Sequence, residues 1–165
     1  MSEVDLNNLT PVASEISTSP ALIRGVAARF KELGCQVRGF DAYVESTVLA
    51  GSGLSSSAAF EVLVGTILNH LFFEGKVSNP EIAMIGQYAE NVFFGKPCGL
   101  MDQTACSVGG FVQIDFKDTK NPVINKVDFN LDEFDHALCI VDTGGNHANL
   151  TGDYADITLE CRQIS

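Results

Sequence analysis

Positive charge is scarce in this 165-residue sequence, which has 10 Lys and Arg residues against 21 Asp and Glu residues and a formal net charge of −11. Such a surface repels the phosphate backbone of nucleic acids and anionic lipid head groups. We therefore expect no nucleic-acid partner and no membrane partner. An anion could still bind locally, where backbone N–H groups, a helix N-terminus or a recruited cation supply positive potential.

Long apolar runs and clustered metal ligands are also absent. No apolar run approaches the ~20 residues that span a bilayer, and the N-terminus has neither a basic start nor an apolar segment typical of a secretory signal. This pattern favours a cytoplasmic protein. The five cysteines contain no C-x-x-C pair and the three histidines are dispersed, so neither a disulfide framework nor a zinc site is indicated.

The apolar content is sufficient for one ordinary hydrophobic core, because 45% of the residues are apolar and 11 are Phe. Residues 1–19 are rich in Ser, Thr, Asn and Asp and predict a loose lead-in, so the folded domain is expected over 20–165. Apolar periodicity predicts helices and strands in a mixed order. The expected helices cover 20–33, 60–72, 80–94 and 154–164, and the expected strands cover 40–50, 112–116, 123–129 and 137–141.

A glycine-serine loop connects the first predicted strand to the second predicted helix. Glycines let a backbone approach an anion closely, and the first N–H groups of the helix point at it, so this design is typical of phosphate binding. The loop lacks the Lys of the P-loop pattern. The alternative is that one serine only caps the helix and the small residues allow close packing. The loop residues are Gly51, Ser52, Gly53, Leu54, Ser55, Ser56 and Ser57.

Two acidic residues are candidates for chemistry, although each also has an ordinary explanation. Glu90 falls on the polar side of the 80–94 helix, and a carboxylate there suits Mg²⁺, although a lone Glu on a helix usually faces solvent. Asp102 lies in a predicted loop, 95–103, where a turn or catalysis could explain it, and spacing alone favours the turn.

Taken together, three motifs resemble those of the GHMP small-molecule kinases, and within that family the galactose-phosphorylating branch. They are the loop sequence GLSSSAA at 53–59, the pair Ala89-Glu90, and the highly specific stretch GKPCGLMDQ at 95–103. The resemblance covers residues 20–160. It implies an α+β fold, the GHMP kinase N-terminal domain of the ribosomal protein S5 domain 2 type, with a mixed sheet packed with helices and present only in part.

The resemblance also implies an activity, which is transfer of phosphate from ATP to the anomeric hydroxyl of galactose. In that case Gly51 to Ser57 would hold the ATP phosphates, Ser57 and Glu90 would bind Mg²⁺, and Asp102 would orient or deprotonate the sugar hydroxyl. Gly99, Asp102 and Tyr154 would line the sugar pocket. Metal, helix dipole and a positioned carboxylate are the parts that phosphoryl transfer needs.

The sequence departs from the family pattern in several places. The family's sugar-binding Gly-Glu-His-Thr-Asp-Tyr motif, its partner Arg and its C-terminal Gly-rich motif have no counterpart. Leu49 replaces a usual Pro, and residues 155–157 replace a usually basic stretch. We therefore expect a fragment that is inactive alone and prone to self-association. The alternatives are an N-acetylgalactosamine kinase, a noncatalytic regulatory relative that binds sugar and nucleotide, and a purely structural domain.

Overall fold

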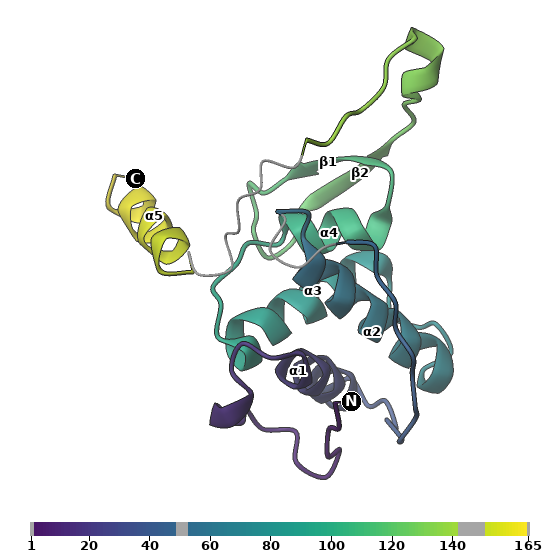
Figure 1. Ribbon diagram of the computed structural model, residues 1–165, viewed down its shortest axis with the longest axis vertical. Helices are drawn as coiled ribbons and strands as arrows, with labels where there is room; N and C mark the ends of the chain where they lie inside the picture. The colour runs from purple at the N-terminus through teal and green to yellow at the C-terminus, as the bar shows by residue number, and fades with distance from the viewer. Residues whose placement is uncertain (1, 49–52, 142–150, 165) are drawn as a thin grey trace.

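The computed structural model describes residues 2–48, 53–141 and 151–164. A small antiparallel sheet lies at one end of a body of helices, which makes the fold α+β (Figure 1). The elements are η1 (Ala13–Glu15), α1 (Ser19–Glu32), α2 (Ser56–Phe72), α3 (Asn79–Tyr88), η2 (Ala89–Phe94), α4 (Met101–Val108), β1 (Phe111–Asp115), β2 (Val123–Val127), η3 (Leu131–Phe134) and α5 (Thr151–Ile164).

Local sequence signals account for the boundaries of the first and third helices. Helix α1 begins at Ser19, with Thr18 in the N-cap position, and places Pro20 in its first turn. It ends before Gly34, whose φ of 89° is the left-handed conformation that glycine adopts readily. Helix α3 opens with a capping box between Ser78 and Glu81. The helices expected over 20–33, 60–72 and 154–164 are confirmed.

The hydrophobic core lies where α1, α2 and α3 meet. Phe30 and Val26 of α1 pack with Leu68 of α2 and Ile82 of α3, and all four are nearly inaccessible to solvent. Burial of aliphatic and aromatic side chains on this scale is the main source of stability, at about 1.5–3 kcal/mol for each side chain. The core therefore fixes the relative positions of the helices that carry the candidate site.

Three secondary-structure predictions are wrong. The described part of the strand expected over 40–50 is irregular, and the apolar run 137–141 forms no strand and exposes Leu138 and Val141. An alternating pattern needs a paired neighbour to become a strand, and the described residues offer none there. The loop expected over 95–103 ends early, because Met101 begins α4.

The sheet consists of β1 and β2, an antiparallel pair in which Phe111 lies opposite Val127 and Ile114 opposite Ile124. Both strands were expected, but the mixed sheet was not found among the described residues, which form two antiparallel strands only. Helix α5 lies apart from the helical body (Figure 1).

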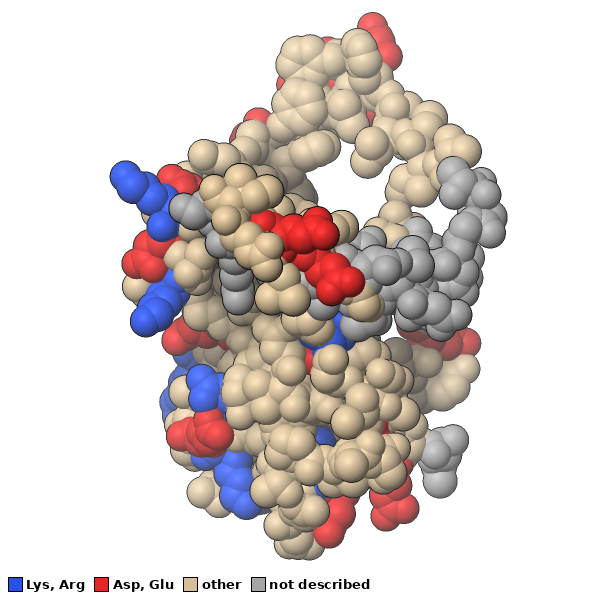
Figure 2. Space-filling model, turned by 90° about the vertical axis from the view of Figure 1, so that its left-hand side faces the viewer, with Lys and Arg blue, Asp and Glu red and all other residues tan. Residues whose placement is uncertain are grey.

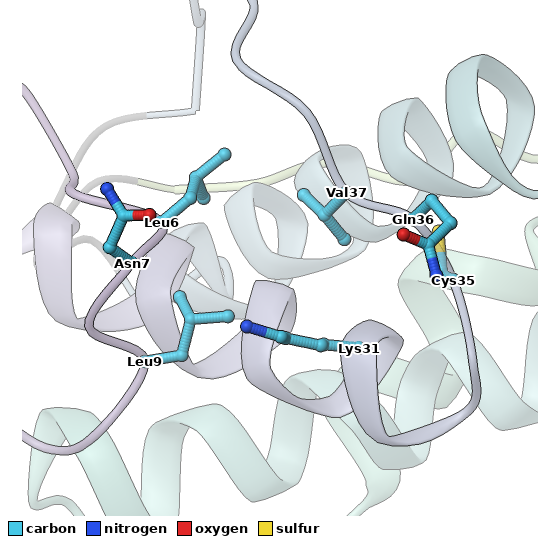
Figure 3. Close-up of a pocket in the computed structure, with 7 residues that line it drawn as sticks. All are labelled: Leu6, Asn7, Leu9, Lys31, Cys35, Gln36 and Val37. Carbon is cyan, nitrogen blue, oxygen red and sulfur yellow. The ribbon is translucent and has the colours of Figure 1, made fainter.

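The lead-in is irregular apart from η1 and is held to α1 by an ion pair between Arg24 and Glu15, 2.6 Å apart. A cleft of about 440 Å³ lies between the lead-in and the end of α1, with Leu6, Leu9 and Lys31 among its lining residues (Figure 3). It contains none of the candidate site residues. None of the helices in the described ranges is long and apolar enough to cross a membrane.

Candidate active site

The glycine-serine loop leads into α2 through two residues with positive φ. Gly51 and Ser52 lie outside the described residues, whereas Gly53 and Ser55 have φ angles of 77° and 58°. Ser55 occupies the N-cap position of α2, but its side chain makes no capping hydrogen bond in the described part of the chain. The explanation of the serines as helix caps therefore does not apply to Ser55. Leu54 is exposed, and Ser56 begins the helix.

Ser57, in the first turn of α2, reaches across to Glu90. Its hydroxyl donates a hydrogen bond of 2.9 Å to Glu90 Oε1. Glu90 belongs to η2, a π-helical segment that continues α3, and it is only 2% exposed rather than facing solvent. Short π-helical segments frequently occur at functional sites. The structure thus brings together two candidate residues that are 33 positions apart in the sequence.

Lys96 provides the positive charge at this carboxylate. Its Nζ lies 3.3 Å from Glu90 Oε1, the same oxygen that accepts the Ser57 hydroxyl. The backbone N–H of Lys96 also donates to the Glu90 carbonyl, at 3.1 Å. Burying a carboxylate is costly unless it is paired and hydrogen-bonded. The ion pair and the hydroxyl together offset that cost for Glu90.

Gln103 joins Glu90 to a second buried acid, Glu61. The Gln103 Nε2 group donates to Glu90 Oε2 at 2.8 Å and to Glu61 Oε2 at 3.1 Å. Glu61 is 0% exposed, and its Oε1 has no hydrogen-bond partner in the described part of the chain. Gly86 makes room for this arrangement, because a Cβ there would lie 3.1 Å from Glu61 Oε2.

Burial, and then the nearby carboxylates of Glu90 and Asp102, raise the pKa of Glu61 to about 8 against the opposing influence of Gln103 and Lys96. Burial, with help from Glu90, also raises the pKa of the Cys98 thiol. Glu61 is therefore protonated and Cys98 is an uncharged thiol at neutral pH.

Asp102 lies half-buried in the first turn of α4, directly before Gln103. Asn91 holds the segment preceding α4, since its Oδ1 accepts from the Cys98 backbone N–H at 2.7 Å. A Cβ on the neighbouring Gly99 would meet no atom within 4 Å, so open space lies above the backbone there. Asp102 and Gly99 thus lie at the accessible edge of the buried network.

Tyr154, the remaining candidate, lies in α5, and its side chain is outside the described residues. The structure therefore does not relate its ring to the other candidates. Among the candidate residues, the structure brings Ser57 and Glu90 into direct contact and places Asp102 beside their hydrogen-bond network.

A magnesium ion fits the chemistry of the Ser57 and Glu90 oxygens. Mg²⁺ prefers hard oxygen ligands and is usually held by one or two carboxylates together with substrate phosphates. Within the described ranges, no three His, Cys, Asp or Glu side chains gather into a metal site. A hydroxyl and one carboxylate therefore suit a metal that completes its shell with phosphate and water, and do not suit a structural zinc.

Comparison with known proteins gives a family match over residues 21–110, to the GHMP kinases N terminal domain. The match covers more than half of the chain. The chain belongs to the GHMP kinase family. Ser57, Glu90 and Asp102 all fall inside the matched range of this family member.

Curated relatives extend the match of this GHMP kinase toward one branch of the family. The chain is 36% identical over 142 residues to a Streptomyces coelicolor protein named galactokinase. This match covers 84% of the chain and 36% of that relative. It is 35% identical over 165 residues to a Streptomyces lividans galactokinase, covering 98% of the chain and 40% of the relative. A Streptococcus suis galactokinase is 32% identical to the chain over 162 residues, and the match covers 98% of the chain and 40% of that relative. The chain thus spans less than half the length of these relatives.

Sequence reasoning missed three members of the site in this GHMP kinase, namely Glu61, Lys96 and Gln103. A signal existed for Glu61, because it lies four residues after Ser57 and so shares a helix face with it. Lys96 and Gln103 lie inside the motif at 95–103, but their spacing gave neither of them a role. Lys96 pairs with Glu90 six residues away, and Gln103 bonds Glu61 42 residues away.

Proposed function

We propose that this chain carries the phosphate-binding and metal-binding parts of a galactokinase, an enzyme that transfers the terminal phosphoryl group of ATP to the anomeric hydroxyl of galactose. The observation that carries the proposal is the contact between Ser57 Oγ and Glu90 Oε1, at 2.9 Å. It joins the glycine-serine loop to a buried carboxylate inside a domain whose curated relatives are named galactokinase. Because ATP is a cytoplasmic metabolite, we also propose a cytoplasmic location.

The loop from Gly51 to Ser57 is proposed to bind the phosphates of ATP. The first N–H groups of α2 form the positive end of a 17-residue helix. Among the described residues the Ser55 side chain does not cap them, which leaves these donors for an anion. This arrangement supplies positive potential in a chain of net charge −11 without a P-loop Lys.

Ser57 and Glu90 are proposed to hold Mg²⁺ together with the ATP phosphates. When bound, the ion neutralises phosphate charge during transfer. Gln103 contributes by fixing Glu90 Oε2, which leaves Oε1 directed at the Ser57 hydroxyl. The chain's own residues thereby hold one carboxylate oxygen and one hydroxyl 2.9 Å apart, close enough to share one metal ion.

Asp102 is proposed as the group that positions and deprotonates the sugar hydroxyl, with Gly99 and Tyr154 in the sugar pocket. Its half-buried place at the edge of the network allows contact with a substrate. The open space over Gly99 leaves room for a sugar close to the backbone. A carboxylate at hydrogen-bond distance from the attacking hydroxyl can accept its proton as the phosphoryl group transfers.

The test replaces the matching segment of the Streptomyces lividans relative with this chain and measures galactose-dependent release of ADP. We expect turnover from the graft, and a loss of about 10²- to 10⁴-fold in kcat for Asp102→Asn with little change in the KM for ATP. The amide keeps the size of the side chain but cannot accept the proton.

Asp128→Asn, which changes an exposed acid elsewhere, is the matched control and should leave turnover unchanged. An Asp102→Asn graft as active as the unchanged graft would contradict the assigned role. A graft that binds ATP and galactose but releases no ADP would instead support a noncatalytic regulatory relative.

A further inference from the structure

Lys96 stands out because it contacts Glu90 twice. Its Nζ lies 3.3 Å from Glu90 Oε1, and its backbone N–H donates to the Glu90 carbonyl at 3.1 Å. The backbone bond anchors the start of the loop directly after η2. The side chain of Lys96 is therefore held next to the carboxylate by its own main chain.

The two oxygens of Glu90 have different partners. Oε2 accepts from Gln103, which is itself 1% exposed and also bonded to Glu61. Oε1 accepts from Ser57 and pairs with Lys96. Oε2 is therefore committed to a buried bridge, whereas Oε1 has a partner, Lys96, that reaches solvent and can give way to a metal ion.

We propose that Lys96 is the resident counter-cation of this site and that it must leave Glu90 Oε1 when a divalent cation binds there. Two cations at one carboxylate oxygen repel each other strongly in a poorly solvated position. Lys96 can move, because its side chain is 33% exposed, whereas that of Glu90 is 2% exposed. Lys96 thus acts as a positioning residue that sets the affinity of the site for metal.

This inference rests on the metal site of the proposed function and adds a competitor to it. The pairing neutralises the buried carboxylate while the site is free of metal. Its cost is weaker metal binding, because displacement of the ammonium opposes each binding event. Removing the charge of Lys96 should therefore lower the stability of the metal-free chain and raise its affinity for metal.

The experiment titrates MnCl₂ into the purified 165-residue chain after treatment with a chelator, with calorimetry for affinity and melting temperature for stability. For Lys96→Met we expect metal binding that is about five- to tenfold tighter and a lower melting temperature in chelator, most of which added metal restores. A purely structural loss would lower the melting temperature with and without metal and would not tighten binding.

Lys76→Met is the matched control, because Lys76 pairs with the exposed Glu74 at 2.9 Å, away from the candidate site. It should change neither quantity. Lys96→Gln keeps a donor without the charge, and it replaces Lys96→Met if that variant does not fold.

Ser57→Ala separates failure of the inference from failure of the proposed function. If Ser57→Ala weakens manganese binding while Lys96→Met leaves it unchanged or weaker, the role of Lys96 is overturned and the metal site stands. If the unchanged chain, Ser57→Ala and the Lys96 variants all bind manganese equally or not at all, the metal site and the inference both fail.

Discussion

Glu61 shows how a single buried acid can make stability depend on pH. Its carboxyl group is 0% exposed and shares Gln103 with Glu90. Burial, and then Glu90 and Asp102, raise its pKa from 4.5 to about 8, against Gln103 and Lys96. Between about pH 4.5 and about pH 8, the folded chain therefore keeps a proton that the unfolded chain has already released.

We expect the free energy of unfolding to fall as the pH rises from about 4.5 to about 8, by at most about 1.4 kcal/mol per pH unit. Glu61→Gln, which resembles the protonated acid, should flatten this dependence and keep the bond from Gln103. Urea unfolding at several pH values checks this. The exposed acid Glu3 offers a control, since Glu3→Gln should leave the slope as it is.

At the scale of elements, the site depends on the close packing of η2 against α1. A Cβ added at Gly25 would lie 2.8 Å from the Cα atom of Ala89, closer than real contacts allow. Ala89 directly precedes Glu90 in η2, so the approach of these two helices fixes the depth of the carboxylate. The glycine is needed here because the clashing atom is backbone and cannot rotate away.

Gly25→Ala should therefore lower the free energy of unfolding by about 1–3 kcal/mol, through overpacking of this contact. Chemical unfolding of Gly25→Ala and of a control variant measures the effect. Gly39→Ala is the matched control, because nothing lies within 4 Å of a Cβ at that position and its φ is not positive. Equal stability of the Gly25 and Gly39 variants would show that η2 can shift without cost.

At the scale of the whole molecule, much apolar surface is exposed. The face in Figure 2 consists largely of uncharged side chains. Apolar side chains that stand out from the described helices and strands include Leu63 at 38%, Leu71 at 58%, Met101 at 61% and Phe111 at 43% exposure. Exposed apolar patches commonly mark surfaces that associate.

We therefore expect the purified 165-residue chain to self-associate and to release little ADP with ATP and galactose. Phosphoryl transfer needs donor, metal and acceptor in one geometry, and an error of about 1 Å can cost roughly 10²-fold. The chain matches only 36–40% of the length of the Streptomyces relatives. Light scattering during size-exclusion chromatography and the ADP assay test this, and turnover equal to that of the graft would contradict it.

The sequence by itself determined the positions of α1, α2, α5, β1 and β2 and the family to which the chain belongs. Apolar spacing and terminal signals such as Pro20 and Gly34 were sufficient for α1, because a helix forms its hydrogen bonds within one segment. The motifs around Ser57, Glu90 and Asp102 also predicted the GHMP kinase family, which the family match confirms.

Only the tertiary structure decided which of these residues meet and in what state. The alternating run after Phe40 looked like a strand, but a strand depends on a partner supplied by a distant part of the chain. The sequence left open whether Glu90 faces solvent or binds a metal, and the structure buries it in η2 against Ser57 and Lys96. Burial, shared hydrogen bonds and charge pairing arise between elements, and so the carboxyl network of this site exists only once the helices have packed.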